Sequence, residues 1–165
     1  MQSRLLIKAI IITLLMPMVG IIFIPYIILH QSDIMYWPVF TAFNILLSVL
    51  ILFGIVILLY CIWEFAFYGK GTLAPLDPPK VLVVSGIYRY TRNPMYLSII
   101  VILLLEALLF KNSYILMYAL ISFFSFHIFV FYYEEPHLRK QFGISYQEYC
   151  IAVPRWGITL KPFNI

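Results

Sequence analysis

Two adjacent carboxylates, Glu134 and Glu135, follow a long apolar stretch and precede Pro136. We expect this run of three residues to end the helix that the apolar stretch forms. The pair could mark a charged boundary at the start of a helix, where the helix dipole favours acidic side chains. It could instead hold a cationic or hydroxyl-rich ligand at a lipid boundary, such as a sulfonium, an ammonium group or a ribose. The pair alone leaves both interpretations open.

A second polar stretch, residues 85–96, reads Ser-Gly-Ile-Tyr-Arg-Tyr-Thr-Arg-Asn-Pro-Met-Tyr. It gathers aromatic rings and guanidinium groups at the start of an expected helix, where Pro94 suits the first turn. Such a place can stack a purine and bind a carboxylate. The alternative is an interfacial belt of aromatic and basic residues, which many membrane proteins have. Gly69 and Gly71 do not match a phosphate-binding loop.

The composition of the 165-residue chain excludes an ordinary soluble globule and a disordered chain. Hydrophobic residues make up 64% and charged residues 11%, against about 45–50% and about 25% in soluble domains. The basic residues form no single stripe, so we expect no nucleic-acid partner. Cys61 and Cys150 are far apart and lack a metal-type spacing, so we expect neither a disulfide nor a metal site.

We therefore expect an all-α integral membrane protein with a single domain, since a spanning helix needs about 20 apolar residues. Four stretches reach or approach that length: residues 9–29, 39–67, 94–110 and 113–133. The link between the last two is so short that they should form an antiparallel hairpin. The first is too long for the apolar core of a signal peptide and lacks a cleavage signal, so we expect it to be retained.

Lysine and arginine residues alternate between the loops that join these helices. They are frequent before the first helix, in residues 69–93 and in residues 134–165, but nearly absent from the two other loops. The positive-inside rule then places both termini in the cytoplasm. Residues 69–93 and 134–165 would lie on the same side of the membrane, as a site built from both segments requires.

Two short helices are expected in the tail. Residues 136–142 form an amphipathic pattern, and Gly143 suits a helix end. Ser145 and Glu148 have the spacing of a capping box, which predicts a helix over residues 146–152.

Three ionisable side chains fall inside the expected spans, where such groups need an explanation. Glu106 should lie near the outer end as a snorkelling or paired carboxylate. Glu64 and His127 should lie at similar depths near the cytosolic boundary. Either side chain could act as the proton acceptor in a reaction, as could a tyrosine, and nothing in the sequence selects among them.

Two motifs in this order carry a resemblance. The first is Gly71-Thr72-Leu73-Ala74-Pro75 with Asp77-Pro78-Pro79, followed by Ser85-Gly86-x-Tyr88-Arg89-Tyr90-x-Arg92-Asn93-Pro94-Met95-Tyr96. The second is Glu134-Glu135 with Leu138, Phe142-Gly143, Tyr146, Tyr149 and Val153-Pro154-Arg155-Trp156. Together they resemble the isoprenylcysteine carboxyl methyltransferase family, which belongs with the phospholipid methyltransferases. The resemblance covers about residues 69–156, just over half of the chain.

The resemblance implies a bacterial-type enzyme of the inner membrane that uses S-adenosylmethionine as methyl donor and no metal. The donor would be bound at the cytosolic face by Tyr88, Arg92, Asn93, Pro94, Tyr96, Glu134, Glu135, Tyr146 and Tyr149. Arg155 and Arg92 would be catalytic, with Arg155 facing a lipidic or prenylated acceptor. The family often has His where this chain has Asn93, so no imidazole can act at that position.

The chemistry of methyl transfer agrees with these residues. The reaction is an in-line displacement in which positioning supplies much of the rate enhancement. A carboxylate acceptor is favoured, because it is already nucleophilic at neutral pH and needs only a cation such as Arg155 to hold it. The neighbours of Arg155 are apolar, so its guanidinium should have a partner, either Glu148 or the acceptor's carboxylate.

Two other functions compete with methyl transfer. An oxidoreductase resembling the steroid reductases would bind NADPH, whose phosphates could meet Arg89, Arg92 and Arg155. The carboxylates of Glu134 and Glu135 would repel those phosphates. A small multidrug-type transporter would need a carboxylate in its first helix, and residues 9–29 contain no charged residue.

Overall fold

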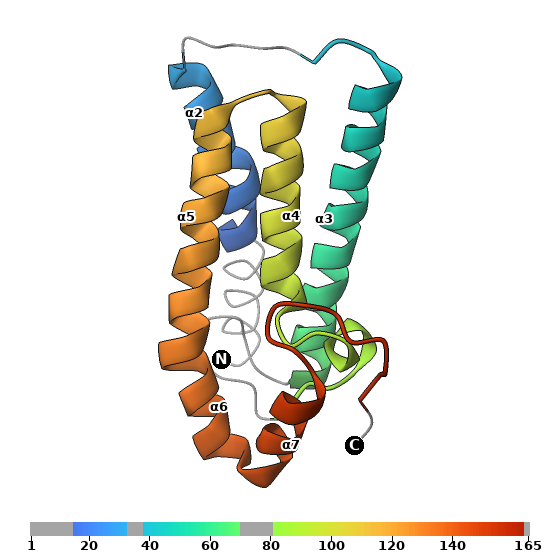
Figure 1. The fold of residues 1–165 in the computed structure, drawn as a ribbon, viewed down its shortest axis with the longest axis vertical. Coiled ribbons are helices and arrows are strands. Elements are labelled where there is room, and N and C mark those ends of the chain that lie inside the picture. The colour runs from blue at the N-terminus through green and yellow to red at the C-terminus, as the bar shows by residue number, and fades with distance from the viewer. Residues whose placement is uncertain (1–14, 33–37, 70–80, 164–165) are drawn as a thin grey trace, which may run out of the picture.

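The computed structural model describes residues 15–32, 38–69 and 81–163 (Figure 1). Within these residues the chain is helical and contains no strand, which confirms the all-α prediction there. The elements are η1 (Val19–Phe23), α2 (Ile24–Gln31), α3 (Ala42–Gly69), η2 (Gly86–Arg89), α4 (Pro94–Leu109), α5 (Ser113–Phe129), η3 (Val130–Glu134), α6 (Glu135–Phe142) and α7 (Ile144–Ala152). Two of the short elements, η1 and η3, are π-helical turns, and η2 is a 3₁₀ turn.

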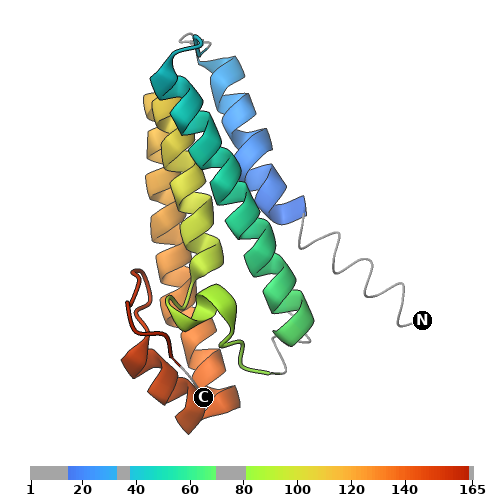
Figure 2. The ribbon, with the colours of Figure 1, turned by 90° about the vertical axis from the view of Figure 1, so that its right-hand side faces the viewer.

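The long helices stand side by side in one bundle, and α6 and α7 fold across one of its ends (Figures 1 and 2). The core lies where α3 and α4 meet, with Leu58, Ile102 and Leu103 almost completely buried. Gly54 permits this close approach, because a Cβ added there would lie 2.9 Å from Ile102 Cγ1. Small residues commonly have this role where apolar helices pack.

Among the described residues, two helices, Ala42–Phe65 and Ser113–Phe142, are long and apolar enough to cross a membrane. The prediction of four spans is therefore only partly met. The other two apolar helices, Leu15–Gln31 and Pro94–Leu109, contain 17 residues or fewer. At 1.5 Å per residue, Pro94–Leu109 reaches about 24 Å, less than the roughly 30 Å of a bilayer core. The predicted start of the first span lies outside the described residues.

The predicted hairpin of α4 and α5 is confirmed (Figure 1). Lys111 turns the chain with a positive φ of 48°. The side chain of Asn112 then caps α5, accepting hydrogen bonds from the backbone N–H groups of Tyr114 at 2.9 Å and Ile115 at 3.2 Å. Its amide nitrogen donates to Ser32 Oγ at 3.1 Å, which ties the hairpin to the end of α2.

The expectation that the fourth helix ends at the Glu134–Glu135 pair is wrong. A continuous helix runs over Ser113–Phe142, and the π-turn η3 ends two residues before Pro136. A proline lacks an N–H and its ring clashes with the carbonyl four residues earlier in an α-helix. The wider π-turn avoids that conflict, so the helix bends and continues as α6 (Figure 1).

The two tail helices are confirmed with small changes at their starts. Gly143 ends α6 with a positive φ of 57°. The capping box at Ser145 and Glu148 is not formed, because α7 begins at Ile144 and its N-cap is Gly143 without a side-chain cap. Ser145 already lies inside the helix, where it cannot cap it.

Candidate functional site

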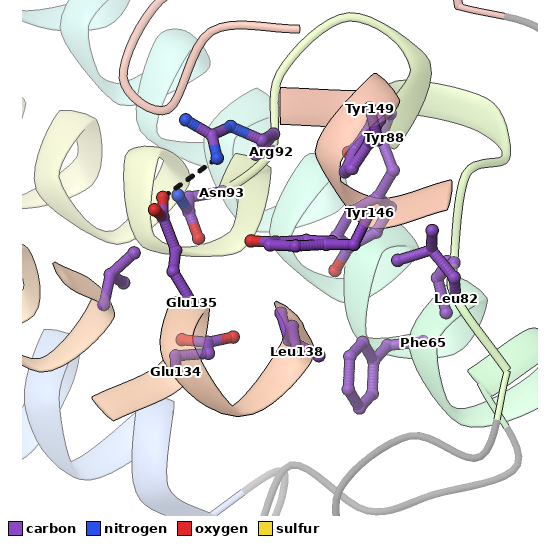
Figure 3. A pocket seen from close by; sticks show the side chains of 12 residues that line it. Phe65, Leu82, Tyr88, Arg92, Asn93, Glu134, Glu135, Leu138, Tyr146 and Tyr149 are labelled. Carbon is purple, nitrogen blue, oxygen red and sulfur yellow. Dashed lines mark hydrogen bonds and ion pairs between the residues drawn. The ribbon is translucent and has the colours of Figure 1, made fainter. Parts of the chain in front are cut away.

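An open cavity lies at the end of the bundle where α6, α7 and residues 82–93 converge (Figure 3). Its volume is about 490 Å³ when the part open to solvent is included. The side chains that line it are Phe65, Leu82, Val83, Tyr88, Arg92, Asn93, Val130, Glu134, Glu135, Leu138, Tyr146 and Tyr149.

The structure brings seven of the nine predicted donor-binding residues into this lining: Tyr88, Arg92, Asn93, Glu134, Glu135, Tyr146 and Tyr149. Tyr96 is outside the lining but contacts it, since its hydroxyl donates to Glu134 Oε2 at 3.2 Å. Pro94 only begins α4. Arg155 is also outside the lining and reaches the cavity through its contact with Glu135.

Five apolar lining residues were missed by the search for chemistry-bearing side chains. Val130, Glu134 and Leu138 are spaced four residues apart, and this helical spacing could have identified Val130 and Leu138. Phe65, Leu82 and Val83 come from other segments and carried no comparable signal. Together these residues give the cavity an apolar wall beside its charged one.

Glu135 is the centre of a charged cluster and is only 3% exposed. Its Oε1 accepts from Arg155 Nε at 2.6 Å, and its Oε2 accepts from Arg155 Nη2 at 2.9 Å. Arg92 Nη1 lies 3.0 Å from Oε1 (Figure 3), and Arg139 Nη2 lies 3.8 Å from Oε2. Such pairing offsets the cost of burying a carboxylate.

The partner of Arg155 is therefore Glu135, and the prediction of Glu148 is wrong. The uninterrupted helix through η3 and α6 places Glu135 within reach of the segment after Pro154. Nε and Nη2 of Arg155 are used in this bidentate pair, while its Nη1 makes no hydrogen bond with the described residues. The guanidinium also lies over the Phe131 ring, 5.0 Å from its centroid.

Arg92 joins the charged cluster to the tail. Its Nη1 also donates to Cys150 Sγ at 2.7 Å, and its backbone N–H donates to the Pro154 carbonyl at 3.1 Å. Its Nε is buried and has no hydrogen-bond partner in the part of the chain that the structure describes. A buried donor of this kind is costly to leave unpaired, so it is available to an acceptor group of a ligand.

Glu134 differs from its neighbour. The hydroxyl of Tyr96 is its hydrogen-bond donor, and no cation of residues 15–32, 38–69 or 81–163 forms an ion pair with it. An ionised carboxylate can accept about four hydrogen bonds. Glu134 therefore offers spare acceptor capacity to the cavity.

Two lining tyrosines and Asn93 use their polar atoms inside the protein. The Tyr149 hydroxyl donates to the Tyr88 carbonyl at 2.6 Å, and Asn93 Nδ2 donates to the Arg155 carbonyl at 3.1 Å. Burial raises the pKa of the Tyr88 and Tyr149 phenols, so both stay protonated at neutral pH. These residues hold the wall together and present mainly their ring or carbon surfaces to the cavity.

The three ionisable groups inside the expected spans do not line the cavity. His127 Nδ1 accepts from Trp156 Nε1 at 2.9 Å, so the basic nitrogen of the neutral imidazole is already occupied. Glu64 is buried against Gly86, where an added Cβ would collide with both carboxylate oxygens. Glu106 Oε2 is buried without a partner among the described residues, so that oxygen neither snorkels nor pairs there.

The comparisons with known proteins gave one match. The model of a family described as phospholipid methyltransferase matches residues 42–145. That range contains α3, α4, α5 and α6 and therefore Arg92 and the Glu134–Glu135 pair. It confirms, at the level of the family, the resemblance carried by the two motifs. No curated protein and no solved structure matched the chain.

Proposed function

The chain belongs to the phospholipid methyltransferase family, and on that premise we propose that it transfers the methyl group of S-adenosylmethionine to a lipidic or prenylated acceptor in the membrane. The observation that carries this proposal is the single cavity in which Glu134, Arg92 and the tyrosines converge. The donor, when bound, supplies an electrophilic methyl group on a sulfonium. The protein's part is then to bind, orient and exclude water.

The residues of the cavity fit the chemical groups of such a donor. Glu134 has spare acceptor capacity for ribose hydroxyls or for the hydrogens of an ammonium group. Arg92 Nε is an unpaired donor for a carboxylate. The rings of Phe65, Tyr88 and Tyr146 offer aromatic surface for a purine.

We propose a carboxylate as the acceptor group, held by the part of Arg155 that Glu135 leaves free. Nε and Nη2 fix the guanidinium on Glu135, so its remaining Nη1 hydrogens are presented in a fixed orientation. Because its side chain is already ordered, this guanidinium can bind a second carboxylate with little further loss of conformational entropy. An amine acceptor would instead need a proton acceptor, and His127 has its Nδ1 engaged by Trp156.

For the membrane, we propose four spanning helices and both termini in the cytoplasm of a bacterial inner membrane. Two helices have the required length, and the two shorter apolar ones pack against them. A short helix can span where the bilayer thins locally, at a cost of fractions of a kcal/mol per Å. Large apolar side chains such as Leu52, Phe53 and Phe124 are exposed on the outside of the bundle, where lipid would cover them.

A binding comparison on detergent-purified protein tests the proposal. S-adenosylhomocysteine should bind, measured by calorimetry, and NADPH should not. The carboxylates of Glu134 and Glu135 support this expectation, because both line the cavity and would repel the phosphates of NADPH. Binding of NADPH without S-adenosylhomocysteine would overturn it in favour of an oxidoreductase.

A further inference from the structure

The segment after Arg155 is fixed to the chain that precedes α4. The backbone N–H of Thr159 donates to the Tyr90 carbonyl at 2.9 Å, and that of Phe163 donates to the Arg89 carbonyl at 3.1 Å. Arg89 Nε returns a hydrogen bond to the Phe163 carbonyl at 3.0 Å. The segment therefore has a defined position although it forms no helix.

Alternate residues of this segment face in different directions. Thr159 and Phe163 are partly buried, and the Phe163 ring lies 5.7 Å from that of Tyr149. Ile158 and Leu160 are instead 73% and 93% exposed, and Lys161 beside them is exposed as well. We call these three residues the boundary patch. Two large aliphatic side chains held in water by a fixed backbone are unfavourable unless something covers them.

The boundary patch lies at the level where α4 begins. Tyr90, to which Thr159 is hydrogen-bonded, precedes Pro94 by only four residues. The views of the fold place the segment beside that end of the bundle (Figures 1 and 2). In the membrane arrangement proposed above, this level is the boundary between the lipid and the cytoplasm.

We propose that the boundary patch is an interfacial anchor that inserts Ile158 and Leu160 among the headgroups of the cytosolic leaflet while Lys161 binds an anionic headgroup. The inference rests on the proposed membrane placement of the bundle. Charge complementarity supports it, because Arg139 and Lys140 of α6, at the same end of the bundle, are also exposed and the chain has a net charge of +4. A second protein copy is a poorer occupant, since stable interfaces use about 20–30 residues a side.

Such an anchor has a consequence for the cavity. The anchored segment directly follows Arg155 and includes Trp156. The side chain of Arg155 binds Glu135, and that of Trp156 binds His127. Insertion of the boundary patch thus holds the Arg155 side of the cavity against the lipid surface from which a lipidic acceptor arrives.

Depth-dependent quenching of an attached fluorophore tests the anchor. Bimane would be placed on Leu160→Cys in a Cys150→Ser background, because Cys61 is fully buried and will not label. In lipid nanodiscs containing anionic phosphatidylglycerol, we expect a blue shift and strong quenching by lipids that carry a shallow nitroxide. The same probe on Gln147→Cys, an exposed polar position of α7, should show neither effect.

A third label separates failure of the anchor from failure of the proposed membrane placement. Phe53 is exposed near the middle of α3, so bimane on Phe53→Cys should be quenched by lipids with a deep nitroxide. Loss of that signal would overturn the membrane placement itself. A quenched Phe53 probe with a Leu160 probe that behaves like the Gln147 probe would overturn only the anchor. A Leu160 signal that depends on protein concentration in detergent would assign the patch to a second copy and also overturn it.

Lys161→Gln tests the electrostatic part of the proposal. In nanodiscs of neutral phosphatidylcholine the Leu160 probe should be less quenched than with phosphatidylglycerol. The substitution should abolish that difference, since the ammonium is the group that attracts the anionic lipid. An undiminished difference in Lys161→Gln would rule out this role for the residue.

Discussion

Glu134 and Glu135 are neighbours in the chain and line the same cavity, yet their surroundings differ. Glu135 is bound by both Arg155 and Arg92, and its two oxygens are engaged. Glu134 has a hydroxyl donor from Tyr96 and forms no ion pair within the described residues. One carboxylate thus holds elements of the protein together, while the other keeps acceptor capacity toward the cavity, where we propose that it binds the donor.

Helix geometry explains how adjacent residues come to differ. Successive side chains on a helix point about 100° apart. Glu134, the last residue of η3, reaches α4 through Tyr96, whereas Glu135, the first of α6, reaches the tail through Arg155. Adjacent identical residues in a motif can therefore have separate roles, which mutagenesis of the pair as a unit would hide.

The largest effect is expected from Glu135→Ala. Removing this carboxylate leaves the guanidinium groups of Arg92 and Arg155 partly buried without their partner, which typically costs about 3–5 kcal/mol. The loss should appear as a lower unfolding midpoint of the detergent-purified protein. Glu134→Ala is the matched control and should destabilise much less. Equal destabilisation by the two variants would break the comparison between them.

Glu134→Ala should instead weaken donor binding. The loss of a charged hydrogen bond costs about 1.5–3 kcal/mol, or roughly tenfold or more in affinity. Calorimetry with S-adenosylhomocysteine measures the effect, and Glu148→Ala, an exposed carboxylate of α7, serves as the charge-matched control. If Glu134→Ala binds like the wild type, Glu134 is only part of a helix boundary.

Arg155→Lys tests whether Arg155, while it is paired with Glu135, also binds the carboxylate of the methyl acceptor. Lysine keeps the charge but loses the two-pronged geometry, so the methyl-transfer rate with an identified acceptor should fall by about tenfold, or 1.4 kcal/mol. Affinity for the donor should change little. Arg139→Lys is the control, because the Arg139 guanidinium also lies near Glu135 but its side chain is 54% exposed. This substitution should have no comparable effect. Full turnover of Arg155→Lys, or loss of donor binding, would contradict the assigned role.

The smallest effect is expected from Cys150→Ser. The thiol accepts from Arg92 Nη1, but Glu135 binds the same nitrogen, and a serine hydroxyl can replace the acceptor. The free energy of unfolding should therefore change by less than about 1 kcal/mol. A larger loss, measured by the same unfolding assay, would mean that Cys150 and not Glu135 fixes the position of Arg92.

Local rules of sequence predicted much of this molecule. The hairpin followed from the short link before Ser113, and the end of α6 followed from Gly143, whose positive φ confirms it. The two motifs supplied most of the polar lining of the cavity. Proline at position 136 misled the prediction, because the rule that proline ends a helix holds for α-helices and not for a helix with a π-turn before it.

Long-range contacts were beyond the reach of the same rules. The pairing of Arg155 with Glu135 depends on where the tail returns after α7, and the sequence does not specify that path. The apolar wall formed by Phe65, Leu82 and Val83 depends in the same way on how the end of α3 and the segment before η2 meet at the cavity. In both cases the residue types were visible, but their distances in space were not.

The π-turn η3 also changes the direction in which side chains point before and after it along the continuous helix of α5 and α6. A π-turn contains one residue more than the α-helical path it replaces, so it rotates everything beyond it by about 100° relative to an unbroken α-helix. The face that Phe123 and His127 present to Trp156 and the face that carries Glu135 can thus be set independently. Deleting a single residue from Val130–Glu134 should therefore return the turn to an α-helical path with Glu135 still facing Arg155. Deleting two residues should rotate Glu135 away from Arg155 by about 100°, whereas the apolar part of α5 would keep its register.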